Sequence, residues 1–83
     1  MAYNVVYKAS VKRDLKKIDK AVARRILQRI ERDLEGDPTS YPPLKGEFAG
    51  LRKYRFGDFR VIFTIIEDEV RILRIAHRKD VYR

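Results

Sequence analysis

The spacing of apolar residues changes along this chain, and each change marks a different kind of element. Residues Tyr3 to Tyr7, YNVVY, are rich in β-branched and aromatic side chains, which favours a first strand. From about Val11 to Ile18, and again between Asp19 and Gly36, apolar residues recur at helical spacing. We expect the side-chain oxygens of Ser10 and Asp19 to cap these two helices. The pattern therefore predicts an amphipathic helical hairpin after the first strand.

Residues 37–50 break the helical periodicity and predict a loop, because this segment holds all three prolines and two of the four glycines. From Leu51 the period is two, which is typical of strands. A last strand is expected from about Val70 to Ala76, after the acidic turn at residues 67–69. The order β-α-α-β-β-β predicts an α+β fold, in which an N-terminal strand is followed by a helical hairpin that packs on one face of a mainly antiparallel sheet. No repeat or second domain is evident, so residues 1–83 are expected to form a single domain.

A tight turn is predicted at Gly57-Asp58, where glycine tolerates the positive φ of a type II′ hairpin. This turn sets the register of the two flanking strands, and cross-strand partners share one side of the sheet. One side then carries apolar residues on which the helices can pack: Tyr54, Phe56, Phe59, Val61, Phe63 and Ile65. The other side carries Lys53, Arg55 and Arg60 within about 7 Å of one another. Cations so close repel each other, which favours a bound anion.

The overall charge supports a polyanionic partner. The chain has 20 Lys and Arg against 12 Asp and Glu, a formal net charge of +8 and a pI near 10. Such a field attracts nucleic acid, a ribosome or an acidic protein. There is no cysteine, which excludes disulfides and thiolate metal sites and fits a cytoplasmic location. No apolar run approaches the roughly 20 residues of a membrane span, so no membrane association is expected.

Neither a metal nor another cofactor is expected. The chain has one histidine, and its only dense acidic cluster, residues 67–69, lies at a predicted turn where solvated carboxylates are usual. Neither a GxxxxGK nor a GxGxxG run is present, which argues against a nucleotide-binding loop.

Three segments carry a resemblance to a known family: Leu44-Lys45-Gly46, the hairpin residues 52–55 and 57–60, and residues 77–82, HRKDVY. In these segments and in the order of its elements, the chain resembles the RelE toxins of the RelE/ParE superfamily of toxin–antitoxin systems. The resemblance implies a type II toxin that enters the ribosomal A site and cleaves mRNA as a metal-independent endoribonuclease. It also implies the ribosome, mRNA and a cognate antitoxin as partners.

The resemblance assigns candidate site residues as well. The candidate catalytic residues are Lys53, Arg55, Arg60, Arg78 and Tyr82, and the candidate substrate-binding residues are Lys45, Arg52 and His77. In this chemistry the ribose 2′-hydroxyl attacks the adjacent phosphorus, so the protein must move protons and stabilise negative charge. Arginine suits the second task because its planar fork holds two phosphate oxygens and stays protonated.

Several roles stay open at this point. Lys53 is either a general base with a lowered pKa or a charged clamp. Tyr82 either stacks on a displaced base or plugs the edge of the sheet. The basic strand positions are also compatible with an ordinary solvent-facing sheet surface. Two other functions fit the same charge pattern: a ParE-like toxin that inhibits DNA gyrase without cleaving nucleic acid, and a non-catalytic RNA-binding module.

Overall fold

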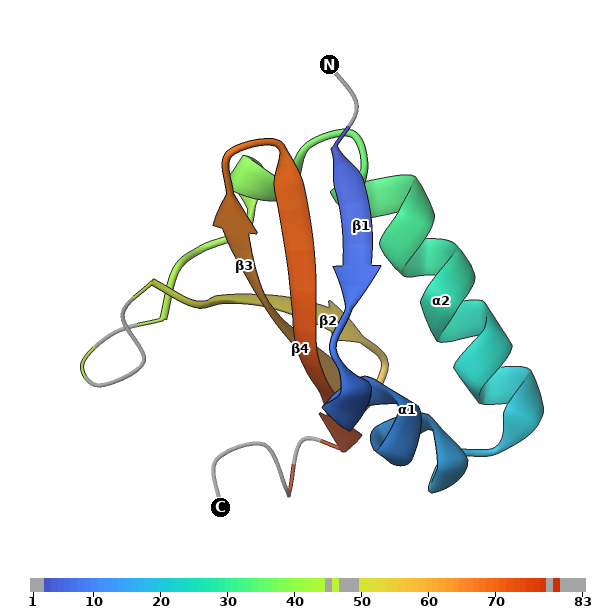
Figure 1. Cartoon of the computed structure of the whole chain (residues 1–83). Helices are drawn as coiled ribbons and strands as arrows, with labels where there is room; N and C mark the ends of the chain where they lie inside the picture. The colour runs from blue at the N-terminus through green and yellow to red at the C-terminus, as the bar shows by residue number, and fades with distance from the viewer. Residues whose placement is uncertain (1–2, 45, 47–49, 78, 80–83) are drawn as a thin grey trace.

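The computed structural model describes residues 3–44, 46, 50–77 and 79 of the chain (Figure 1). The elements follow in the order β1 (Asn4–Tyr7), α1 (Ala9–Lys16), α2 (Lys20–Leu34), the short 3₁₀ helix η1 (Pro38–Ser40), β2 (Arg52–Phe56), β3 (Phe59–Ile66) and β4 (Glu69–His77). The four strands form one sheet in the order β1-β4-β3-β2. β1 is parallel to β4, and the other pairs are antiparallel. The predicted α+β class and element order are confirmed.

Of the two predicted helix caps, the one at Asp19 is confirmed and the one at Ser10 is wrong. Asp19 caps α2 as expected, because its carboxylate accepts hydrogen bonds from the N–H groups of Ala21 and Val22 at 3.0 and 3.4 Å. The predicted Ser10 cap is wrong: α1 begins at Ala9, and Ser10 lies inside its first turn. The Ser10 hydroxyl instead donates to the carbonyl of Leu73 at 2.7 Å. That carbonyl lies beyond the last residue paired between β1 and β4, so a side chain takes the place of a strand partner.

The core lies between the helices and one face of the sheet. Ile26, Ile30 and Leu34 form the buried stripe of α2, and each is 0 % exposed. They pack in one cluster with residues that the sequence placed on the apolar side of the hairpin, including Tyr54, Val61 and Phe63. Phe56, Phe59 and Ile65 are partly buried against the same cluster. The predicted apolar side of the sheet is therefore confirmed.

The β2–β3 hairpin has the predicted register, with Phe56 opposite Phe59 and Arg55 opposite Arg60. Gly57 has a φ of +59°, whereas Asp58 is outside the left-handed region. A positive φ at the first central residue alone matches a type II′ turn, which needs glycine there.

An irregularity in the β3–β4 pairing reverses the side-chain alternation of β4. Ile62 pairs with Arg74 and the next residue, Phe63, pairs with Ile72, so Leu73 has no partner in the register. Before this bulge Ile72 shares the helix-facing side with Phe63. After the bulge the odd-numbered residues of β4 point toward the helices instead. The last of them, His77, pairs with Phe59.

Neither helix in the described ranges has the length and apolar character needed to cross a membrane.

Candidate functional site

Three cationic side chains gather on the face of the sheet that points away from the helices. Arg55 lies directly opposite Arg60, and Lys53 lies opposite Ile62. Since cross-strand partners share a face and Tyr54 points into the core, these residues point to the other side. We call Lys53, Arg55 and Arg60 the basic cluster. Its formation depends only on the alternation of β2 and β3 and on the tight turn between them.

The basic cluster lacks compensating charge in the part of the chain that the structure describes. The ion pairs found there join Arg32 to Asp33, Arg71 to Glu69 and Arg74 to Asp14, and none includes a member of the cluster. Like charges placed directly opposite in a sheet are destabilising. The Nε of Arg60 is also buried without a hydrogen-bond partner. An anion such as a phosphate would relieve the charge repulsion between Arg55 and Arg60.

Ile62 forms an apolar floor beside the basic cluster. It is only 6 % exposed, yet it does not belong to the core cluster beneath the helices. Its neighbours across the sheet are Lys53 on β2 and Arg74 on β4. Long cationic side chains pack their methylene stems over apolar surface while their charged ends stay in water. This arrangement suits a ligand that has both charged and apolar parts.

Arg74 lies next to the basic cluster but is already paired. Its Nε and Nη2 donate to the two carboxylate oxygens of Asp14 at 2.9 and 3.1 Å, and these bonds raise the pKa of Arg74. Asp14 is 7 % exposed and also accepts from the Ile75 N–H at 2.9 Å. Sequence reasoning missed this pair. Its signal was the position of Asp14 within the apolar stripe of α1, between Val11 and Leu15.

Arg52 lies on the other side of β2 from the basic cluster, because it pairs with the buried Phe63. Its Nη1 donates to the carbonyls of Thr39 and Tyr41 at 3.2 and 2.6 Å. The Tyr41 ring packs edge-on against Tyr54, with 5.2 Å between the ring centroids. Arg52 therefore holds the loop after α2 against the sheet.

His77 is also separated from the basic cluster, since the β4 bulge turns it to the helix-facing side. Its ring packs edge-on against Phe59 at 5.7 Å, and its Nδ1 accepts from the Lys79 N–H at 3.3 Å. It borders a hollow of about 190 Å³ that Lys17 and Ile18 also line. Lys45, Arg78 and Tyr82 lie outside the described residues, so their places in the site stay predictions.

A hydrogen-bonded group anchors β2 from behind the basic cluster. The hydroxyl of Tyr54, which lies between Lys53 and Arg55, donates to Asp33 at 2.5 Å, and Arg32 donates to the other oxygen at 2.9 Å. The bond from Arg32, followed by that from Tyr54, lowers the pKa of Asp33. Burial is the main cause that raises the pKa of Tyr54, and the bond to Asp33 adds to it. The sequence alone did not reveal this group.

The family model and the relatives that this chain matches are all toxins. Residues 5–82 match the family model described as the ParE toxin of the type II toxin–antitoxin system parDE. The chain is 33 % identical to toxin RelG of Mycobacterium tuberculosis over 86 residues, covering 100 % of this chain and 99 % of that protein.

Two solved structures are similar to this fold. The toxin–antitoxin complex RelBE2 of M. tuberculosis contains a chain with 29 % identity and a TM-score of 0.85, covering 94 % of this chain and all of that one. The archaeal RelE–RelB complex of Pyrococcus horikoshii contains a chain with 29 % identity and a TM-score of 0.72, covering 98 % of this chain and all of that one.

Proposed function

Because the chain belongs to the RelE/ParE superfamily of type II toxins, we propose that it is an endoribonuclease that cleaves mRNA on the ribosome and is restrained by a cognate antitoxin. The observation that carries this proposal is the basic cluster, in which Arg55 and Arg60 face each other with no acidic partner among the described residues. Such a surface fits a phosphate of the RNA backbone. The solved complexes of similar toxins support the antitoxin as a partner.

The proposed reaction needs no covalent intermediate with the protein. The 2′-oxygen of the ribose loses its proton to a base and forms a bond to the adjacent phosphorus. The bond from phosphorus to the 5′-oxygen of the next nucleotide breaks, and that oxygen gains a proton. The products are a 2′,3′-cyclic phosphate and a free 5′-hydroxyl. The protein must therefore place the phosphate, move two protons and stabilise charge on the nonbridging oxygens.

We assign charge stabilisation to Arg60, the member of the basic cluster on the inner strand β3, together with Arg78 from the C-terminal segment. Arg55 faces Arg60 across the hairpin and would hold the same phosphate from the other side. Lys53 either accepts the 2′-proton or clamps the backbone one nucleotide away. Tyr82 would stack on a base beside the cleaved bond. We leave Arg52 out of the reacting group because its Nη1 is bound to the loop.

The test is to add the purified toxin to a translation extract and to map the 5′ ends of a reporter mRNA. We expect new ends within codons for the wild type and strongly reduced cleavage for Arg60→Gln. Arg71→Gln is the control, because Arg71 is an exposed cation of β4 that pairs with Glu69. Intact mRNA with the wild-type protein would contradict the proposal.

The matched family model is named for ParE toxins. The resemblance to those toxins implies the second candidate, inhibition of DNA gyrase without nuclease activity. Under that alternative the basic cluster is a docking surface rather than a catalytic one. A gyrase supercoiling assay separates the two functions, since only the alternative predicts loss of supercoiling together with intact mRNA.

A further inference from the structure

A second group of cations lies on α2, on the other side of β2 from the basic cluster. Arg25 and Arg29 are exposed and one helical turn apart. The guanidinium of Arg29 lies over the ring of Phe56, with 5.6 Å between its Cζ and the ring centroid. Together with Gln28 and Arg32, these residues line a hollow of about 360 Å³ between α2 and the end of β2. We call this hollow the arginine hollow.

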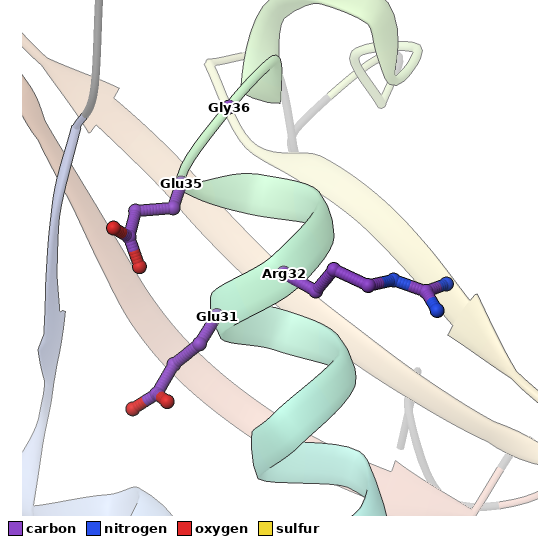
Figure 2. A pocket seen from close by; sticks show the side chains of 4 residues that line it. All are labelled: Glu31, Arg32, Glu35 and Gly36. Carbon is purple, nitrogen blue, oxygen red and sulfur yellow. The ribbon is translucent and has the colours of Figure 1, made fainter.

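The glutamates of α2 lie away from this group (Figure 2), and its one ion pair among the described residues joins Arg32 to Asp33. Figure 2 shows Glu31 and Glu35 on one flank of α2, toward β1, whereas Arg32 extends from the opposite flank toward β2. Arg32 is paired with Asp33, but Arg25 and Arg29 form no ion pair with any residue that the structure describes. Like charges four residues apart destabilise a helix by about 0.2–0.5 kcal/mol. An anionic ligand beside Arg25 and Arg29 would relieve this repulsion.

The chemistry of the lining favours a phosphate backbone over a protein segment. A peptide that binds in a groove needs apolar positions for its anchor residues. A different groove, between α1 and α2, supplies those through Leu15, Ile18 and Leu27. The arginine hollow offers three arginines, an amide and one aromatic ring. A guanidinium held on an aromatic face is weakly hydrated and still presents its fork to phosphate oxygens.

The position of β2 connects the two cationic groups. β2 is at the edge of the sheet, and Arg55 and Phe56 are consecutive residues whose side chains point to opposite faces. The basic cluster therefore lies on one side of this edge strand and the arginine hollow on the other. We propose that the arginine hollow binds the phosphate backbone of a second RNA segment while the basic cluster holds the segment that reacts. The second segment would be structural RNA of the ribosome, so this inference rests on the proposed function.

The test compares two double variants that remove the same charge from the same helix. Arg25→Gln/Arg29→Gln removes the cations of the arginine hollow. Lys20→Gln/Arg24→Gln, also exposed and four residues apart, removes two cations that line the groove between α1 and α2. Gln and Arg have similar helix propensity, so both variants should fold, which a thermal melt checks. The probe is small ribosomal subunits, titrated from 50 to 300 mM salt.

For Arg25→Gln/Arg29→Gln we expect roughly tenfold weaker binding at physiological salt. The slope of log K against log[salt] should be less steep by about 1.4 to 1.8, which corresponds to two fewer phosphate contacts. Lys20→Gln/Arg24→Gln should keep the wild-type slope. Arg25→Lys/Arg29→Lys, which keeps the charge, should restore the slope.

Equal losses in both Gln variants would mean that only the overall field matters and would overturn the inference. Unchanged subunit binding combined with weaker antitoxin binding would also overturn it, in favour of a protein ligand. Because binding is measured without cleavage, a failure of this inference is distinguishable from a failure of the proposed reaction.

Discussion

Asp14 and Arg74 are 60 residues apart in the chain and are joined by two hydrogen bonds, from Arg74 Nε at 2.9 Å and from Nη2 at 3.1 Å. The same carboxylate accepts from the backbone N–H of Ile75 at 2.9 Å. α1 thus continues the edge of β4 beyond the end of β1, with side chains in place of a strand. This contact holds the C-terminal half of β4 beside the basic cluster.

Replacing Asp14 with Ala should lower the free energy of unfolding by about 2–3 kcal/mol. The change leaves the buried N–H of Ile75 without a partner and removes the carboxylate that pairs with Arg74. Urea unfolding followed by circular dichroism measures the effect. Glu31→Ala, an exposed acid on α2, is the control and should change stability by less than about 0.5 kcal/mol. An unchanged free energy of unfolding for Asp14→Ala would show that β4 needs no support from α1.

The hairpin turn should be sensitive to a single methyl group. Gly57→Ala forces alanine into a φ of +59°, which costs about 1–2 kcal/mol. Gly36→Ala is the matched control, because a Cβ there meets nothing within 4 Å and its φ is not in the left-handed region. We expect the control to be neutral or slightly stabilising. Thermal melts of both variants test this, and equal melting temperatures would contradict the turn assignment.

Tyr54→Phe should lower stability at neutral pH by about 1 kcal/mol, because Asp33 loses a hydrogen bond. The variant should also change how the free energy of unfolding depends on pH above pH 10. Folding raises the pKa of Tyr54 above its ordinary value of 10, so the stability contributed by the protonated phenol is complete below pH 10 and is lost as the pH rises above it. The difference between wild type and Tyr54→Phe should therefore shrink above pH 10.

The contribution of Asp33 to stability is lost at low pH, whereas that of Tyr54 is lost at high pH. Its pKa is lowered from 3.8, so its contribution is present above about pH 4 and is lost as the pH falls through the lowered value. Urea unfolding at a series of pH values measures both limbs. A wild-type to Tyr54→Phe difference that stays constant from pH 3 to 11 would contradict the assigned hydrogen bond.

Arg60→Gln should reduce the rate of mRNA cleavage by roughly 100-fold, which is the usual effect of removing one donor that stabilises transition-state charge. Arg60→Lys keeps the charge but loses the planar fork, so we expect an intermediate rate. Single-turnover cleavage on programmed ribosomes separates this effect from binding. Arg71→Gln should stay within about twofold of the wild type. A wild-type rate for Arg60→Gln would remove Arg60 from the reaction.

Arg52→Gln should behave differently from Arg60→Gln. The variant loses bonds to the carbonyls of Thr39 and Tyr41, so we expect about 1 kcal/mol lower stability with a cleavage rate close to that of the wild type. The same two assays measure both quantities. A large loss of cleavage at unchanged stability would return Arg52 to the substrate-binding residues.

Local chemistry was enough to predict most of the architecture. The change from helical to alternating periodicity, the Asp19 cap and the Gly57 turn each depend on a few neighbouring residues, and the structure confirms all three. The turn also placed Lys53, Arg55 and Arg60 on one face, because alternation in a strand leaves no other choice once the register is set. The gathering of the basic cluster therefore follows from sequence alone.

Long-range pairing decided the rest. The bulge at Leu73 moves His77 to the side of Phe59 and away from the basic cluster, although nothing near His77 in the sequence signals a bulge. Asp14 finds Arg74, and Tyr54 finds Asp33, only after strands and helices have packed. Sequence periodicity specifies which way a side chain points within its own element. The partner that it meets depends on how elements distant in the chain are brought together, and buried polar groups must then be satisfied by whatever lies there.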